Sequence, residues 1–441
     1  MATLRAIATE MVRKVPGDIF REESIASLTA TTAVVTALAV GGWSNDKFAS
    51  QFLWRPDTTT LADKSRYVTA FTSSTGTFTH AGTNYADTTA TGEKLIVSRV
   101  EPYIIRQAID SAIRRLKTVD RTEMPMVNGQ GSYSLGDLDW IRQPSDILRI
   151  TYNHSPVITR NRYLQKRNSV NSSGVFLPDW WTVANNADAT PFEVTNYRGQ
   201  KYQYSLERSG GVNATLVQAV GALRSGVTTD SPVGETITAV IVFNPDTAAD
   251  VLLTLTDGTT SATSTGSGSA LQEASASITL AAAATEVTIT VTAQTSNAAQ
   301  KVNEVYALIG ELTDAVRRDN YQEYALDRND WDFDQNGVLT LRTPSLGRGQ
   351  LLIYSKRPYP GFDATRLSTG DADADSTDAP TEAVVAGALS RIYFGLEGAS
   401  SPNYAFWENE FSILSRGHFY EYASAVPQFL APLAPRPRFL R

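Results

Sequence analysis

One stretch decides the helical part of the fold: EPYIIRQAIDSAIRRLK, residues 101–117. Its apolar residues recur at intervals of three and four, which is the spacing of one face of an α-helix. Pro102 lies near the start, where the first turn of a helix tolerates proline. The stretch predicts a core helix, and we interpret Arg106, Arg114 and Arg115 as either a solvated flank or contacts to a neighbouring subunit or to DNA.

Helices are also predicted near both ends of the chain. At 4–15, apolar residues recur at helical spacing until Pro16-Gly17 ends the pattern. A pair of helices is predicted over 380–422, where Pro380 suits a helix start and two apolar rows follow it.

Working outward from 101–117, the residues on both sides have β patterns. Residues 24–99 are rich in Thr, Val and aromatic residues separated by glycines, which predicts several short strands. Further strands are predicted near 133–135, 147–152, 338–341 and 351–354, where apolar and polar residues alternate. Together with the helices they form the predicted host domain, residues 1–209 plus 311–426.

Residues 210–310 have a different composition, dominated by Ala, Thr, Ser, Val and Gly. Their short, regularly spaced strand patterns are typical of a β-sandwich. Within them, the Gly/Ser/Thr-rich run 259–269 is predicted to be a loop. The predicted fold class is therefore α+β, with a helical core, a β-rich host domain and an all-β sandwich of jelly-roll type inserted into a surface loop.

The last residues, 427–441, contain prolines too densely spaced for a helix. We predict an extended tail that docks on a neighbouring subunit through apolar and basic side chains. The candidate docking residues are Phe429, Leu430, Leu433, Arg436, Arg438, Phe439, Leu440 and Arg441.

Composition restricts the possible functions. The 441 residues include 39 Lys plus Arg against 46 Asp plus Glu, a net charge of −7 that does not suit a basic nucleic-acid-binding surface. There is no cysteine, and the three histidines lie far apart in the sequence, which leaves little material for metal or general-base chemistry. We therefore expect no enzyme, no metal and no cofactor. The N-terminus lacks a secretory h-region and no stretch predicts a membrane helix, so we expect synthesis in a host cytoplasm.

Three local patterns have both a functional and a structural interpretation. The run Asp332 to Gly337 matches the first half of an EF-hand calcium loop, but position twelve is Thr343, so we favour a type I′ hairpin. The acidic run 371–378 could collect a cation, although a solvated loop is the favoured interpretation. The aromatic patch around Trp180-Trp181 could stack on sugars or bases, but core packing is favoured. That patch also contains Phe176, Tyr197, Tyr202 and Tyr204.

The order of these elements resembles the head-to-tail connector, or adaptor, proteins of tailed bacteriophages. The resemblance covers most of the chain outside the insert and lies in local phrases and their order, with no catalytic signature. These phrases are FLWRP at 52–56, YVT at 67–69, VEPYIIRQAIDSAIRRL at 100–116, YSL at 133–135, PSDILRI at 144–150, VLTL at 338–341, LLIYSKRP at 351–358 and the helix pair from Pro380.

The resemblance implies a structural protein of the virion neck. Copies would form a ring of about a dozen subunits that joins the portal of the capsid to the tail or nozzle protein, with fibres as further possible partners. Genomic DNA would pass through the lumen without sequence-specific binding. The insert resembles the carbohydrate-binding jelly rolls of phage virions, but its aromatic residues are only Phe243 and Tyr306, so we favour a decoration over a glycan-binding module.

Two other functions remain open at this stage. One is a carbohydrate-binding or host-adhesion protein of the tail, in which the sandwich would be the working part. The other is a structural component of a tail or baseplate hub.

Overall fold

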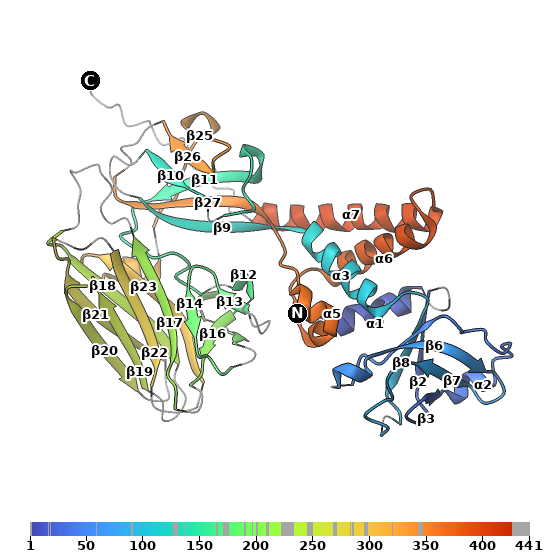
Figure 1. Ribbon diagram of the computed structural model, residues 1–441. Helices are drawn as coiled ribbons and strands as arrows, with labels where there is room; N and C mark the ends of the chain where they lie inside the picture. Colours follow the sequence, from blue (N-terminus) through green and yellow to red (C-terminus); the bar gives the residue numbers. More distant parts are fainter. Residues whose placement is uncertain are drawn as a thin grey trace. The chain divides into compact units, whose positions relative to one another are not determined.

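The computed structural model (Figure 1) describes residues 2–15, 17, 19–58, 60–89, 91–126, 131–136, 138–164, 166–170, 176–188, 191–195, 197–199, 202–208, 211–221, 233–244, 250–267, 271–282, 284, 286–294, 299–319, 321–342 and 347–425. The chain folds into two compact units. We name Met1–Lys117 with Pro358–Ala423 the helical unit, and Thr118–Arg357 the sandwich unit.

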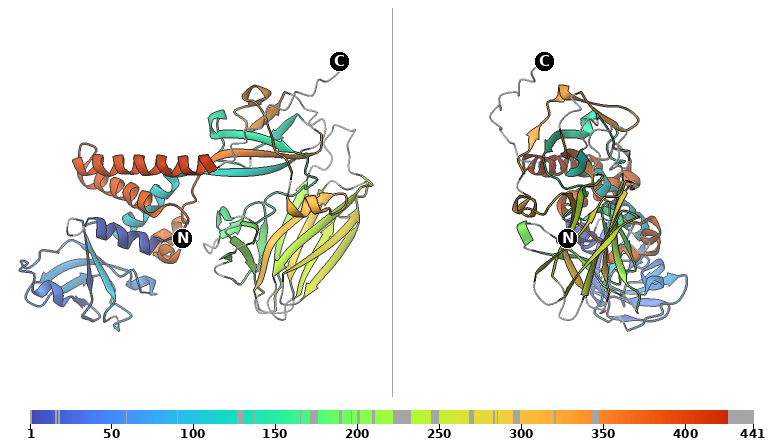
Figure 2. Two further views of the ribbon diagram at one scale, coloured as in Figure 1. Left: turned by 180° about the vertical axis from the view of Figure 1, so that it is seen from behind. Right: turned by 90° about the vertical axis from the view of Figure 1, so that its left-hand side faces the viewer.

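Helices form the larger core of the helical unit. The amphipathic helices α1 (Leu4–Lys14) and α3 (Pro102–Arg115) pack with the C-terminal pair α6 (Thr381–Glu397) and α7 (Pro402–Ala425), which Figures 1 and 2 show side by side. Gly387 of α6 makes the close approach possible, because a side chain there would meet the Phe411 ring of α7. The helices predicted at 4–15, 101–117 and 380–422 are therefore confirmed.

An antiparallel sheet of seven strands completes the helical unit, in the order β2-β8-β5-β6-β7-β4-β3. One side contributes Phe20, Trp54 and Ile96 to the helical core, and the other side has its own core around Phe71 and Phe78. This confirms the β interpretation of 24–99. The strands are β2 (Phe20–Ser24), β3 (Ser27–Leu28), β4 (Thr32–Val34), β5 (Phe52–Trp54), β6 (Ser65–Thr72), β7 (Thr77–Ala81) and β8 (Lys94–Ser98).

Short strands and helices complete the helical unit. The strand β1 (Ala2–Thr3) pairs with β28 (Ser376–Thr377), so the start of the chain is held beside the acidic run. The remaining short helices are α2 (Thr36–Ala39), η1 (Leu61–Asp63), α5 (Ala364–Thr369) and η5 (Asp371–Ala374).

The sandwich unit consists mainly of two five-stranded antiparallel sheets with a shared apolar core. Sheet G has the order β14-β17-β22-β19-β20, and sheet E has the order β15-β16-β23-β18-β21. Sheet G contains β14 (Thr182–Ala184), β17 (Ala214–Gly221), β19 (Asp250–Thr256), β20 (Ser261–Ser267) and β22 (Glu286–Ala293). Sheet E contains β15 (Phe192–Val194), β16 (Tyr202–Leu206), β18 (Thr236–Asn244), β21 (Gln272–Thr279) and β23 (Gln300–Ile309).

Two smaller sheets in the same unit share a second apolar core. Their strands confirm those predicted near 133–135, 147–152, 338–341 and 351–354. One sheet contains β24 (Tyr324–Ala325), β11 (Ile147–Asn153), β27 (Gly349–Pro358) and β9 (Lys117–Met126); the other contains β10 (Ser132–Ser134), β26 (Val338–Leu341) and β25 (Trp331–Phe333). A further pair is β12 (Lys166–Val170) with β13 (Phe176–Pro178), and the short helices are η2 (Pro144–Asp146), η3 (Tyr197–Gly199), η4 (Arg328–Asp330) and α4 (Asp314–Arg318).

Three predictions about this region are wrong. The boundary at Gly210 lies too late, because the three-residue strands β14 and β15 and the strand β16 already belong to the sandwich. The host strands group with the sandwich and not with the helices, so the division of the chain falls at Lys117 and Pro358. The predicted loop 259–269 contains the edge strand β20, which pairs along β19 and lets the bare α-carbon of Gly266 contact the Phe243 ring.

Candidate functional site

The three arginines predicted to contact another subunit all have partners within the helical unit. Arg106 is buried and binds both carboxylate oxygens of Asp373, at 2.7 and 3.1 Å. Arg114 binds Asp110 at 2.8 Å and donates to the carbonyl of Phe362. For Arg106 both interpretations, a solvated flank and a contact to another chain or to DNA, are wrong, because the side chain is buried.

Arg115 joins two helices of the same unit. Its guanidinium pairs with Glu408 of α7 and lies over the Phe411 ring, 4.2 Å from the ring centroid. Although partial burial opposes the charged form of Glu408, hydrogen bonds from Arg115 and Ser390 lower the pKa of this carboxyl. The side chain therefore acts first as an intramolecular bridge between α3 and α7.

The acidic run is neither a solvated loop nor a cation site in its central part. Asp373 is 2% exposed and also binds Lys64 at 3.1 Å, so one carboxylate neutralises two buried cations. Asp375 pairs with Arg366 at 2.9 Å. Burial, helped by the nearby carboxylates of Asp371 and Asp373, nevertheless raises the pKa of Asp375 to about 6. These carboxylates hold η5 against α3 and the sheet.

The helices expose large apolar side chains. On the α6–α7 hairpin these are Phe394, Leu396, Phe406 and Ile413, between 41% and 57% exposed, and Ile104 of α3 is 47% exposed. Phe406 and Ile413 stand seven residues apart, which places them on one side of α7. Helical periodicity predicted apolar rows on these helices, and only the structure shows which of their apolar residues stay exposed. The predicted docking residues of the tail, Phe429 to Arg441, lie outside the described residues.

The aromatic patch around Trp180-Trp181 packs within the sandwich unit. Trp181 is buried and donates from its indole nitrogen to the carbonyl of Asn161. Trp180 is covered on one face by the guanidinium of Arg160, 4.5 Å from the ring centroid. Tyr204 is fully buried. The favoured interpretation, core packing, is confirmed for these residues.

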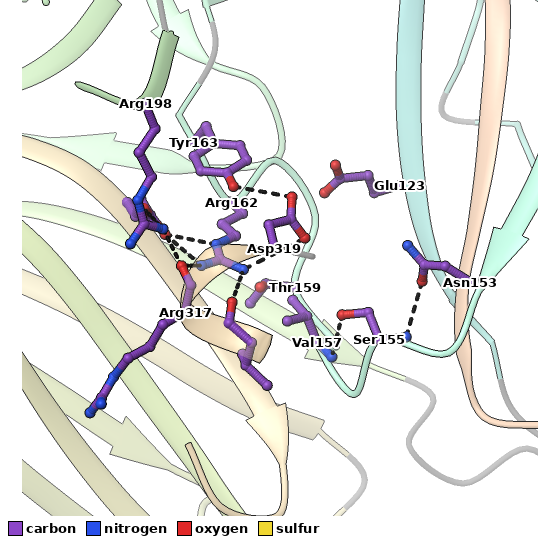
Figure 3. A network of polar contacts seen from close by, with 12 residues as sticks. Glu123, Asn153, Ser155, Val157, Thr159, Arg162, Tyr163, Arg198, Arg317 and Asp319 are labelled. Atoms are coloured by element: carbon purple, nitrogen blue, oxygen red, sulfur yellow. Dashed lines mark hydrogen bonds and ion pairs between the residues drawn. The ribbon is translucent and has the colours of Figure 1, made fainter. Parts of the chain in front are cut away.

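A buried polar network connects β23 to neighbouring segments of the sandwich unit (Figure 3). Glu304 of β23 is fully buried and accepts from Arg162 at 2.8 Å, from Arg198 at 2.8 Å and from Tyr197. Arg162 also donates to the carbonyls of Val316 and Arg317 at 2.8 and 3.2 Å, which ties α4 to the sheet. No sequence motif indicated this network, since its members come from four separate segments.

The network consists of ion pairs and hydrogen bonds that connect separate segments of the sandwich unit. Two arginines face the carboxylates of Glu304 and Asp319, and Arg162 also lies over the Tyr306 ring at 3.9 Å. Burial raises the pKa of Tyr306 to about 12 and raises the pKa of Tyr163 as well, so both phenols stay neutral and offer no general base. Arg162 and Arg198 both pair with carboxylates of the network, which is the arrangement of a structural contact.

The EF-hand-like run forms a hairpin between β25 and β26. One Asp334 oxygen accepts from the backbone nitrogens of Asn336 and Val338, both at 2.9 Å. Only Gly337 has a positive φ, whereas a type I′ turn requires two such residues, so the hairpin is confirmed and its turn type is wrong. In the part of the chain that the structure describes, no group of three or more His, Asp or Glu side chains could hold a metal ion.

The two outer faces of the sandwich differ in chemistry. Sheet E buries Val240, Tyr306 and Leu308 beneath α4, whose Val316 packs on them. In sheet G every second residue of a strand points outward, as the threonines do in VTITVT, 287–292. These outward residues are half-buried or exposed, and no described element covers them. The alternation was visible in the sequence, but only the strand order shows that the threonines share one face.

Comparisons with known proteins give a limited result. No family model and no curated protein matches the chain. Similar solved structures include a carbohydrate-binding module, TmCBM61, in complex with beta-1,4-galactotriose (15% identity, 34% of this chain and 98% of that chain, TM-score 0.25). They also include the CBM22-1 xylan-binding domain from Paenibacillus barcinonensis Xyn10C (9% identity, 36% and 97%, TM-score 0.26).

A third similar structure is the enzymatically active domain of tailspike protein 4 from bacteriophage CBA120. It has 11% identity, covers 30% of this chain and 19% of that chain, and has a TM-score of 0.23. None of these three structures is a phage connector. Among the described helices, none combines the length and the apolar character needed to span a membrane. About a third of the chain is thus similar to carbohydrate-binding modules and to part of a phage tailspike, at a level that decides neither its family nor its function.

Proposed function

We propose that the chain is a structural protein of a tailed-phage virion that assembles with copies of itself into the ring between portal and tail. The observation that carries this proposal is the exposed apolar surface of the helical unit. Phe394, Leu396, Phe406 and Ile413 lie on one helical hairpin and are each about half exposed. Phe406 and Ile413 share one side of α7, and large apolar side chains exposed in this way are typical of a surface that another protein covers.

The arginines of α3 are already paired within the helical unit, and this favours a subunit contact made by apolar side chains. Arg106, Arg114 and Arg115 are engaged by Asp373, Asp110 and Glu408. Arginines that are already paired add little to an interface, because a new partner would have to displace an existing one. The proposed subunit contact therefore depends on the α6–α7 hairpin, where burying each half-exposed side chain would contribute about 1 kcal/mol.

The tail supplies the proposed contact to the portal. Residues 427–441 contain three arginines and no acidic residue, while the whole chain carries −7. A basic and apolar segment rich in proline suits a groove on a neighbouring protein. In this proposal DNA passes through the ring without sequence-specific contacts.

The tail is tested by truncation. A phage that encodes a chain ending at Ala425 is expected to produce filled heads and free tails, because the subunit folds but does not join them. The matched control replaces residues 427–441 by a Gly/Ser segment of equal length, which should give the same defect. Normal yields of complete virions from both variants would refute the role of the tail.

A carbohydrate-binding, tail-associated protein is the second candidate. The similar solved structures agree with this candidate better than with a ring, because they are carbohydrate-binding modules and part of a tailspike. The observation on this chain that favours it is the outer face of sheet G, which presents mainly hydroxyl groups and has one exposed carboxylate, Glu286, at the end of β22. The aromatic residues Phe243 and Tyr306, which the strand pattern placed in the insert, are both buried, so stacking on a sugar is not how such binding would work.

A further inference from the structure

The outer face of sheet G is a regular array of threonines. The pairing of its strands aligns outward residues in ranks that run across the sheet. The first rank is Thr182, Val217, Thr290, Thr254, Thr263; the second is Ala184, Thr215, Thr292, Leu252, Thr265; the third is Ala219, Thr288, Thr256, Ser261. Nine of these fourteen residues are threonine, and we name the set the threonine face.

The threonine face has an unusual composition for a protein surface. None of its fourteen residues is charged, although a quarter of an average chain is, and none is aromatic. Thr256 uses its hydroxyl within the β19–β20 turn, at 2.9 Å from the carbonyl of Thr260. None of the hydrogen bonds among the described residues takes up the hydroxyls of Thr254, Thr288 or Thr290.

This arrangement offers hydrogen bonds at little entropic cost. Each threonine hydroxyl both donates and accepts, and its β-branched side chain is already restricted in rotation on a strand. Strands lie about 4.8 Å apart and outward residues repeat about every 6.8 Å, so the hydroxyl and methyl groups are spread over a surface about 19 Å wide. A ligand that presents hydroxyl edges and C–H faces matches both kinds of group.

The size and the charge of the threonine face argue against a second copy of the chain and against a charged polymer as its ligand. The face covers roughly 400 Å², about half of what each partner contributes to a stable protein interface, so a second copy is not favoured. An acidic polymer or a nucleic acid would need lysines or arginines, and no residue of the face is basic. A long neutral polymer remains, because it can engage many weak sites at once when the protein is present in several copies.

We propose that the threonine face binds a neutral polysaccharide, laid flat across the ranks and held by hydroxyl–hydroxyl hydrogen bonds. This inference rests on the second candidate function and specifies its surface and its ligand class. Single-site affinity would be weak without an aromatic platform. Assembly of several chains would then supply the avidity that attachment to a cell surface needs.

Affinity electrophoresis of the full chain tests the proposal, with dextran, mannan or galactan in the gel as neutral probes and alginate as the acidic one. The variant T254V/T288V/T290V deletes three hydroxyls and keeps the side-chain shape, and T290K places a charge at the centre of the face. The control S275V alters an exposed serine of β21, on the outer side of sheet E. Circular dichroism checks that all variants fold.

Retardation by at least one neutral polysaccharide is expected, with an affinity reduced at least about tenfold in the triple variant, lost in T290K and unchanged in S275V. Equal retardation of the wild type and T290K would overturn the threonine face and leave the carbohydrate-binding function standing. Retardation by alginate alone would overturn the neutral ligand. If no polysaccharide retards the wild type, the second candidate function fails, and this inference with it.

Discussion

Replacing Asp373 by alanine is expected to destabilise the helical unit strongly. The carboxylate is 2% exposed and accepts three charge-assisted hydrogen bonds, from Arg106 at 2.7 and 3.1 Å and from Lys64 at 3.1 Å. It joins three segments: η5, the helix α3 and the turn that precedes β6. The substitution leaves two cations buried without their shared partner.

The magnitude follows from this geometry. Removing one partner of a buried ion pair costs about 3–5 kcal/mol, because the remaining charge cannot regain its hydration. For a unit of roughly 180 residues, each kcal/mol corresponds to a shift in Tm of about 2–4 °C. The expected decrease is therefore about 6–20 °C. Asp371→Ala, two residues away and exposed, is the matched control and should change Tm by about 2 °C or less.

Differential scanning calorimetry measures this effect. Only the transition of the helical unit should move, and Glu304→Ala, which opens the network of the sandwich unit, identifies the other transition. A triple variant with Asp373→Ala, Arg106→Met and Lys64→Met removes the buried charges altogether and should recover most of the lost stability. If Asp373→Ala changes Tm no more than Asp371→Ala does, or if the triple variant is less stable than Asp373→Ala alone, the reasoning is refuted.

Three further predictions concern the helical unit. Gly76→Ala should lower the free energy of unfolding by at least about 2 kcal/mol, because φ is +65° and a β-carbon would lie 2.1 Å from the carbonyl oxygen of Val35. Thermal unfolding measures this, and Gly82→Ala, whose β-carbon would have nothing within 4 Å, should lower the stability less. The raised pKa of Asp375, about 6, means that the folded state holds its proton more tightly, so the stability from this group is full below pH 3.8 and is lost as pH rises through 6; Asp375→Asn should remove that dependence. Burial lowers the pKa of His80 below 6.5, so its effect on stability has the opposite dependence on pH. Its contribution to the free energy of unfolding is present above pH 6.5 and is lost at lower pH. The C–H resonances of its ring should titrate below 6.5 in NMR spectra.

The parts of the fold that depend on local sequence could be predicted. The helices α3 and α6 follow from apolar residues repeated at helical spacing, and β18 and β22 follow from short strand patterns. The edge strand β20 could not be predicted in this way, because its Ser, Thr and Gly residues carry no apolar signal. It is a strand only because β19 provides the hydrogen bonds.

Candidate functional residues were harder to predict, because their partners are distant in sequence. Arg106 and Asp373 are separated by 267 residues, so nothing near Arg106 showed that it is buried and neutralised. The same holds for Arg162 and Glu304, separated by 142 residues. The threonine face depends on strand order: each strand shows its own alternation, but only the register of β17, β22, β19 and β20 places the threonines in ranks.

The mass of the purified protein in solution tests the central claim of assembly through the helical unit most directly. Multi-angle light scattering with negative-stain imaging is expected to show a ring of roughly a dozen chains of 47.9 kDa each, formed by the protein alone or on addition of its portal. The variant F406E/I413E, which places charges on the exposed side of α7, should remain a folded single chain under both conditions. A wild-type protein that stays a single chain with and without the portal would contradict the account.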